Sequence, residues 1–146
     1  YTFLILVFFM YPPVELQAKR AKQPLPPAYQ NFFSMAKSMQ KQLPKNTICC
    51  CRKPEFFTFY APNLYAVNYK YTLNANELIQ YLIQKKVEYV ILEQLGFGST
   101  GRYLYPAIMA HQELFPVVWQ LPNPDTYLLK FERQQAVEKL NNVVVE

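Results

Sequence analysis

This chain of 146 residues has few glycines, one histidine and no spaced cysteines. The shortage of histidine and of spaced cysteines excludes disulfide frameworks and zinc sites. The three cysteines are consecutive, at Cys49–Cys51. Neighbours in an extended chain point to opposite faces, so these thiols cannot form a disulfide framework. A zinc site needs spaced cysteines or several histidines, and the chain has His111 alone. We expect the cysteines to be small apolar residues of a buried strand, and we expect no metal and no cofactor.

Charged residues are also scarce, at 17% of the chain, whereas hydrophobic residues make up 51% and aromatic residues 16%. This composition excludes a disordered chain. The net charge of +5 is unevenly distributed along the chain. Residues 15–54 hold eight lysines and arginines but only one acidic residue, Glu15. No zinc-finger spacing or RNA-binding aromatic motif accompanies them, so no nucleic-acid partner is expected. Basic residues near an apolar terminus suit anionic lipid headgroups, and a solvated helix face is the plainer alternative for many of them.

The main apolar run is Tyr1–Met10, and prolines and cations follow it directly. A bilayer core needs ~20 apolar residues, about twice this run. We interpret residues 1–10 as the end of a transmembrane helix that begins upstream, with a buried core strand as the alternative. Five prolines make residues 11–27 an extended linker. A soluble domain, residues 28–133, and a tail, residues 134–146, complete the chain, and the tail is expected to be a short helix or disordered.

Periodicity predicts that helices and strands alternate in the soluble domain. Asn74 followed by Glu77 predicts a helix start of the capping-box type, and Pro122–Asp125 predicts a hairpin turn. Such alternation is typical of an α/β fold. We expect a mixed, mainly parallel sheet of about five strands with helices on both faces, plus a C-terminal antiparallel hairpin. The predicted helices cover 28–43, 54–61, 74–86 and 100–114, and the predicted strands cover 47–51, 64–71, 87–92, 117–121 and 126–131.

All three glycines lie in the run Gly96–Gly101, which spells the G-x-G-x-x-G pattern of dinucleotide-binding loops. The run follows the third predicted strand instead of the first, and no acidic residue stands ~20 positions further on. A tight turn in which Ser99 or Thr100 caps the next helix is therefore the favoured interpretation. A second interpretation stays open: backbone amides at Gly98, Ser99 and Thr100, with Arg102, hold a phosphate of a lipid or sugar carrier.

Two further polar residues are candidates for function. Glu93 follows a central strand at its carboxyl end, where ligands of α/β sheets bind, although a role as a cap or in an ion pair is the plainer interpretation. His111 is expected near the C-terminal end of a helix, where a positive charge interacts favourably with the helix dipole. No nucleophile elbow surrounds Ser99, so a triad with His111 and Asp125 is not supported. The sequence therefore predicts no catalytic residue in this chain.

A longer stretch, Leu43–Leu95, carries a resemblance to a known family. The elements that carry it are Leu43-Pro44 with Thr47, the Cys-Arg-Lys-Pro of Cys51–Pro54, and the strand Val87–Leu92 after an Asn-Glu-Leu helix. They sit behind the apolar terminus, and the similar region covers most of residues 28–131. This region resembles the C-terminal soluble domain of bacterial GT-C membrane glycosyltransferases, the group that includes protein O-mannosyltransferase-like and aminoarabinose transferase-like enzymes.

The resemblance implies an integral enzyme of the bacterial inner membrane that transfers a sugar from a polyprenyl-phosphate carrier on the periplasmic side. The catalytic acid of that family lies in an early extracytoplasmic loop, so none is carried over to this chain. The implied partners are the transmembrane part of the same protein and a membrane lipid or the polyprenyl-phosphate carrier. One feature departs from the family. Lys19, Arg20 and Lys22 follow the apolar run closely, and basic residues are usually retained in the cytoplasm.

Three hypotheses follow from these observations. The first is a non-catalytic accessory domain of a membrane glycosyltransferase. The second is a stand-alone phosphate- or nucleotide-binding α/β module that uses the glycine run. The third is a ligand-free interaction domain anchored by one helix. The number of hydrophobic spans upstream of Tyr1 distinguishes them: many for the first, none for the second and one for the third.

Overall fold

The computed structural model describes residues 23–143 of the chain. The transmembrane segment expected at residues 1–10, and most of the linker expected at residues 11–27, lie outside the described residues. Within residues 23–143, none of the helices has the length and apolarity needed to cross a bilayer.

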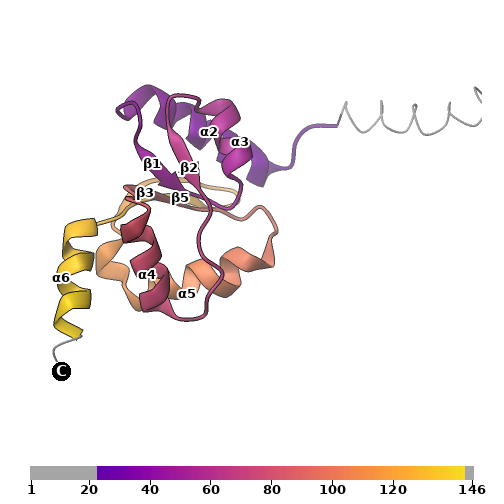
Figure 1. Ribbon diagram of the computed structural model, residues 1–146. Coiled ribbons are helices and arrows are strands. Elements are labelled where there is room, and N and C mark those ends of the chain that lie inside the picture. Colours follow the sequence, from indigo (N-terminus) through magenta and orange to yellow (C-terminus); the bar gives the residue numbers. More distant parts are fainter. Residues whose placement is uncertain (1–22, 144–146) are drawn as a thin grey trace, which may run out of the picture.

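A five-stranded sheet in the order β2-β1-β3-β5-β4 forms the centre of the domain (Figure 1). Strand β1 pairs in parallel with both β2 and β3, whereas β5 pairs antiparallel with β3 and β4. The predicted α/β class, the mixed sheet and the C-terminal hairpin are confirmed. The strands are β1 Ile48–Cys50, β2 Tyr65–Val67, β3 Tyr89–Leu92, β4 Val117–Leu121 and β5 Thr126–Lys130.

Helices α2 (Pro27–Gln42) and α3 (Pro54–Tyr60) cover one face of the sheet (Figure 1). Each begins with proline in its first turn, a position that needs no backbone N–H donor. The apolar side chains of α2 pack on this face against Cys49 and Cys51, while Cys50 points into the core on the other face. All three cysteines are fully buried, Cys49 and Cys50 in β1 and Cys51 directly after it, which agrees with their expected role as small apolar residues.

The other face is covered by α4 (Ala75–Gln84) and by a helical segment made of η1 (Thr100–Leu104), α5 (Tyr105–Ala110) and η2 (Gln112–Leu114). The side chain of Asn74 caps α4 by accepting a hydrogen bond from the backbone N–H of Glu77 at 3.2 Å, as predicted. Glu77 does not complete the capping box, because its carboxylate accepts from Lys70 and Thr72 instead. Helix α6 (Arg133–Val143) follows β5 and buries Ala136 in the same core.

The helix predicted at 100–114 is interrupted, and Pro106 explains its first part. Pro106 has no N–H to bond the carbonyl four residues earlier, so the preceding turn opens into a π-helix. The N–H of Tyr105 then bonds to the carbonyl oxygen of Thr100, five residues back. Strand β2 is also shorter than the predicted 64–71. The chain leaves the sheet after Val67, and Tyr69 turns inward to become 3% exposed.

Candidate functional site

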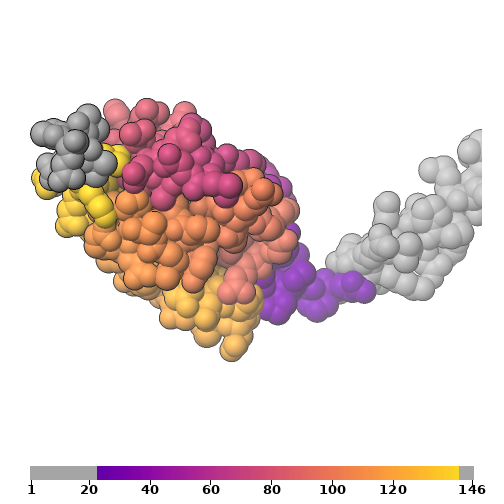
Figure 2. Space-filling view, turned by 90° about the horizontal axis from the view of Figure 1, so that it is seen from below, coloured from indigo at the N-terminus to yellow at the C-terminus, as the bar shows by residue number. Residues whose placement is uncertain are grey.

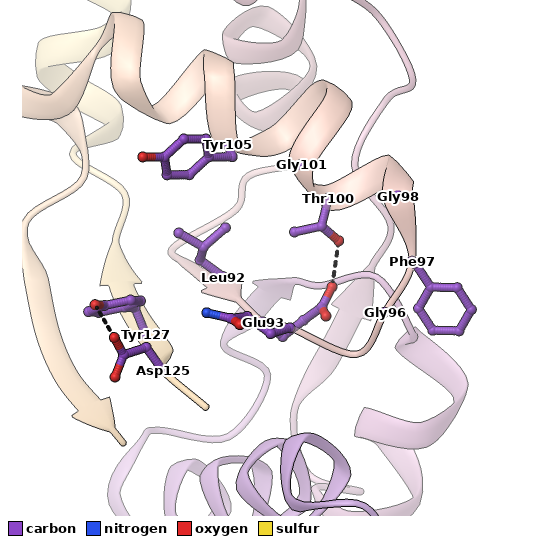
Figure 3. A pocket seen from close by; sticks show the side chains of 11 residues that line it. Leu92, Glu93, Gly96, Phe97, Gly98, Thr100, Gly101, Tyr105, Asp125 and Tyr127 are labelled. Carbon is purple, nitrogen blue, oxygen red and sulfur yellow. Dashed lines mark hydrogen bonds between the residues drawn. The ribbon is translucent and has the colours of Figure 1, made fainter. Parts of the chain in front are cut away.

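An open hollow of about 630 Å³ lies at the carboxyl end of β3, between the loop that follows this strand and the β4–β5 hairpin (Figure 3). Glu93 and Thr100 form one side, and Asp125, Tyr127 and Tyr105 form the other. Its lining also includes Leu92, Gln94, Phe97 and the three glycines of the loop, Gly96, Gly98 and Gly101. Carboxylate, amide, hydroxyl and aromatic groups line this hollow, but no lysine or arginine does.

Glu93 is buried, with 3% of its surface exposed, and both of its carboxylate oxygens are engaged. One accepts a hydrogen bond from the hydroxyl of Thr100 and the other from the backbone N–H of Leu95, each at 2.6 Å. The sequence suggested a cap or an ion pair for this residue. The structure instead shows a carboxylate that ties the loop after β3 to the helical segment.

The hydroxyl of Thr100 is the end of a longer chain of hydrogen bonds. Because Thr100 donates to Glu93, it can accept from the hydroxyl of Tyr69 at 3.0 Å. The hydroxyl of Ser99 then donates to the Tyr69 oxygen at 3.1 Å, and Arg52 Nε donates to Ser99 at 2.8 Å. We call these five residues the relay. Burial raises the pKa of Tyr69, and its bonds to Ser99 and Thr100 partly offset that rise.

The relay fills the crevice in which an α/β sheet usually binds a nucleotide. Arg52 follows the carboxyl end of β1, and Glu93 follows that of β3. In the order β2-β1-β3, the crevice at the reversal of strand order lies between β1 and β3. Here the relay side chains span it. The open space lies on the other side of β3, against β5.

The other residues of the glycine run lie differently from the prediction. Helical backbone begins at Gly98, two residues before η1, so Ser99 and Thr100 lie inside the first turn and neither side chain caps it. Gly96 takes a φ of +85°, a conformation that strongly favours glycine, and turns the chain toward the helix. Arg102 is exposed and its guanidinium lies 5.4 Å from the ring centre of Tyr103, outside the hollow. Gly98, Thr100 and Glu93 meet at the hollow, while Ser99 and Arg102 do not.

The sequence did not predict three residues of the relay and the hollow, which are Arg52, Asp125 and Tyr127. Arg52 follows a strand end, the same signal that identified Glu93, and could have been found. Asp125 and Tyr127 belong to a hairpin, and only the antiparallel pairing of β3 with β5 brings them near. Asp125 accepts from Gln120 at 3.0 Å and from the hydroxyl of Tyr127 at 3.2 Å. Partial burial and the neighbouring Asp125 raise the pKa of Tyr127.

His111 corrects another expectation. It ends α5 and is 9% exposed, with its Nε2 2.9 Å from the side-chain oxygen of Asn76. Burial lowers its pKa, Lys139 lowers it further, and Glu113 partly offsets both. His111 does stand at the C-terminal end of a helix, as expected, but its lowered pKa disfavours the positive charge that was expected there. It pairs with α4, whereas Ser99 belongs to the relay and Asp125 to the hairpin, so the three form no triad.

A second surface feature is a cluster of aromatic side chains on α2 and α3, which we call the aromatic face. Ring contacts between 4.4 and 6.4 Å connect its members, which are Tyr29, Phe33, Phe56, Phe59 and Tyr60. Phe59 is 79% exposed, and Leu25, which precedes α2, is 50% exposed. Lys37 lies 4.9 Å from the ring centre of Tyr60, and Lys53 lies 5.7 Å from that of Phe56.

The aromatic face, the hollow and the point where the described chain begins are linked in space. Asn31 in the first part of α2 donates to the backbone oxygens of Pro122 and Pro124 in the hairpin turn, at 2.9 Å each. Figure 2 shows the start of α2, in indigo, emerging beside this hairpin. The next residue of the turn, Asp125, lines the hollow. These features therefore lie toward one end of the domain.

Comparisons with protein-family models, with curated proteins and with solved structures find no match for this chain. Among the described residues, no group of three or more histidine, cysteine or acidic side chains could hold a metal ion. Arguments about function therefore depend on the site and the surface themselves.

Proposed function

We propose that this chain is a non-catalytic accessory domain of an integral-membrane glycosyltransferase that takes its sugar from a polyprenyl-phosphate donor. In this proposal the domain lies on the periplasmic side of the bacterial inner membrane. It docks over the transmembrane part of the same protein and shapes the access of the acceptor or of the lipid carrier. The resemblance of Leu43–Leu95 to the soluble domains of such enzymes suggested this role.

The aromatic face is the observation that carries the proposal. The exposed rings of Phe56 and Phe59, with half-buried tyrosines and with lysines beside them, suit a bilayer interface, where the surroundings are apolar on one side and wet and anionic on the other. Burying one exposed phenylalanine contributes about 1.5–3 kcal/mol, so Phe59, 79% exposed in the free domain, adds to the binding of this surface at the interface. The face also adjoins the start of α2, toward which the apolar sequence at Tyr1–Met10 leads.

The engagement of Glu93 supports a non-catalytic role. A general base must be free to reach a substrate proton, whereas both oxygens of this carboxylate already accept short internal hydrogen bonds. The remaining hydroxyls of the relay are likewise paired with one another. In this account the chemistry of transfer belongs to the membrane-embedded part of the enzyme.

The proposal is tested on the full-length protein encoded by the complete reading frame. We expect several further hydrophobic spans upstream, each of ~20 residues. Reconstituted in vesicles with a polyprenyl-phosphate sugar, this protein should transfer the sugar, and Phe56→Ser with Phe59→Ser should reduce transfer at least tenfold, by loss of about 1.5–3 kcal/mol of docking energy.

The matched control changes an exposed apolar pair elsewhere on the domain. Val117 and Val118, at the start of β4, are 59% and 55% exposed, and their replacement by serine should leave transfer unchanged. A reading frame without upstream spans, or equal activity in both double variants, would contradict the proposal.

The alternative is a stand-alone phosphate- or nucleotide-binding module, and one observation favours it. Arg52 and Lys53 lie near the start of the helical segment, with their cationic groups 4.8 Å from the ring centre of Phe97. Backbone amides at a helix start can hold a phosphate. Titration of the chain with inorganic phosphate tests this: shifts of the amides of Gly98–Arg102 would support the module, and unchanged amides would exclude it.

A further inference from the structure

The position of the open space suggests what kind of molecule it could take. The relay spans the crevice between β1 and β3, where nucleotides usually bind. The hollow on the β5 side of β3 remains open, and its volume of about 630 Å³ lies within the range of small-molecule sites. We propose that this hollow binds a sugar that carries no anionic group, neutral or amino-substituted, and that it rejects phosphates.

The charges of the lining exclude an anion. Glu93 and Asp125 both contribute carboxylates, and none of the lining residues is a lysine or arginine. A phosphate in the hollow would face both negative groups without a compensating cation. Such repulsion is worth more here than in bulk water, because the walls lower the effective dielectric constant. An anionic ligand is therefore disfavoured, and a ligand with an ammonium group is favoured.

The hydrogen-bonding capacity of the lining favours hydroxyl groups. Each oxygen of Asp125 accepts one internal hydrogen bond and retains acceptor capacity for a second. Gln94 is exposed at the mouth and offers both a donor and an acceptor. Sugar hydroxyls can donate to the carboxylate of Asp125 and accept from the amide of Gln94. A purely apolar ligand would displace water from this remaining hydrogen-bonding capacity without replacing its bonds, at a cost in free energy.

Two tyrosines provide the apolar contact that a sugar ring needs. Tyr105 is 47% exposed at the start of α5, and the ring of Tyr127 lies near Asp125 on the same side of the hollow (Figure 3). Their rings can pack against the C–H face of a pyranose, and their hydroxyls can form hydrogen bonds. Rings, carboxylates and an amide around one hollow thus match a ligand with both apolar faces and hydroxyl edges.

The test is a titration of the isotopically labelled 146-residue chain in detergent micelles, observed by the NMR signals of its backbone amides. The probes are glucose, glucosamine and inorganic phosphate, each raised to about 50 mM so that dissociation constants in the millimolar range are detected. We expect both sugars to shift the amides of residues 94–100 and 125–127, with tighter binding of glucosamine. Phosphate should shift neither group.

Variants separate the site from general effects on the fold. Tyr105→Ala should weaken sugar binding about three- to tenfold through loss of the ring contact. Its matched control is Tyr65→Ala, because Tyr65 is an exposed tyrosine (59%) on β2, at the other edge of the sheet. That control should bind normally. Asp125→Asn should weaken the preference for glucosamine over glucose, because one of the two lining carboxylates that attract the ammonium group is then neutral.

Three outcomes would overturn the sugar site. They are the absence of shifts with either sugar, any shift of the same amides with phosphate, and equal weakening in Tyr105→Ala and Tyr65→Ala. The sugar site goes beyond the accessory role and fails independently of it. Loss of sugar binding would leave the docking of the aromatic face unaffected, and a failure of docking would leave the titration unchanged.

Discussion

Replacing Glu93 with glutamine tests the relay directly. The carboxylate is buried and accepts two hydrogen bonds of 2.6 Å, one from Thr100 and one from the N–H of Leu95. Glutamine keeps one acceptor oxygen, but its NH₂ group then faces a donor. A hydrogen bond to a charged group contributes about 1.5–3 kcal/mol, and a buried donor without a partner costs a further ~1–3 kcal/mol.

From these values we expect Glu93→Gln to lower the free energy of unfolding by about 2.5–6 kcal/mol. That is a large share of the ~5–15 kcal/mol typical of a domain. Urea unfolding followed by the fluorescence of Trp119, the single tryptophan, should show a lower midpoint with an unchanged slope. The matched control is Glu138→Gln on the exposed side of α6, where we expect a change within about 0.5 kcal/mol.

A double-mutant cycle with Thr100→Val examines the coupling itself. Because the hydroxyl of Thr100 donates to Glu93, the two substitutions remove the same bond, and their effects should fall short of additivity by about 1 kcal/mol or more. Strict additivity, or a Glu93→Gln variant as stable as the unaltered chain, would refute the structural role of Glu93. Glu93 would then again be a candidate catalytic residue.

Three further predictions concern His111, the three cysteines and the cap of α4. Burial lowers the pKa of His111 below that of the unfolded chain (~6.5), so protonation favours unfolding, and stability should fall as the pH drops below about 7. Urea midpoints of the His111→Gln variant should lack this part of the pH dependence; an unchanged dependence would contradict it. Burial raises the pKa of Cys51 to about 12 and also raises those of Cys49 and Cys50, so a thiol reagent should modify none of them rapidly before denaturant is added. Asn74→Ala removes the cap of α4 and should cost about 1 kcal/mol in a thermal or urea unfolding experiment, whereas Asn74→Asp should not.

Local patterns were enough to predict most of the fold. The spacing of apolar residues predicted α2, the cap at Asn74 predicted α4, and the Pro-Asn-Pro-Asp run of Pro122–Asp125 predicted the hairpin. These features depend on neighbours in sequence, so a single chain reveals them. Pro54 followed by Glu55 likewise predicted a short helix against the strand preference of the phenylalanines, and α3 is that helix.

The candidate site was predicted only in part, because distant segments build it. Glu93 was found from its position after a strand, but its bond to Thr100 depends on how the loop turns at Gly96. The inward turn of Tyr69 shortens β2, and a pattern of alternating aromatic residues gives no sign of it. Ser99 and Thr100 were interpreted as caps because their hydroxyls suit that role locally. Long-range bonds to Arg52, Tyr69 and Glu93 took precedence.

The most direct test of the accessory role is to find which surface of the domain meets the bilayer. The 146-residue chain is reconstituted in bilayers that contain anionic lipids, some of which carry a paramagnetic label in the headgroup. Signal broadening should then concentrate on the aromatic face, at Phe56 and Phe59, and should spare α4 and α6. Uniform broadening, or broadening centred on α4, would contradict the proposal that the α2–α3 surface meets the membrane.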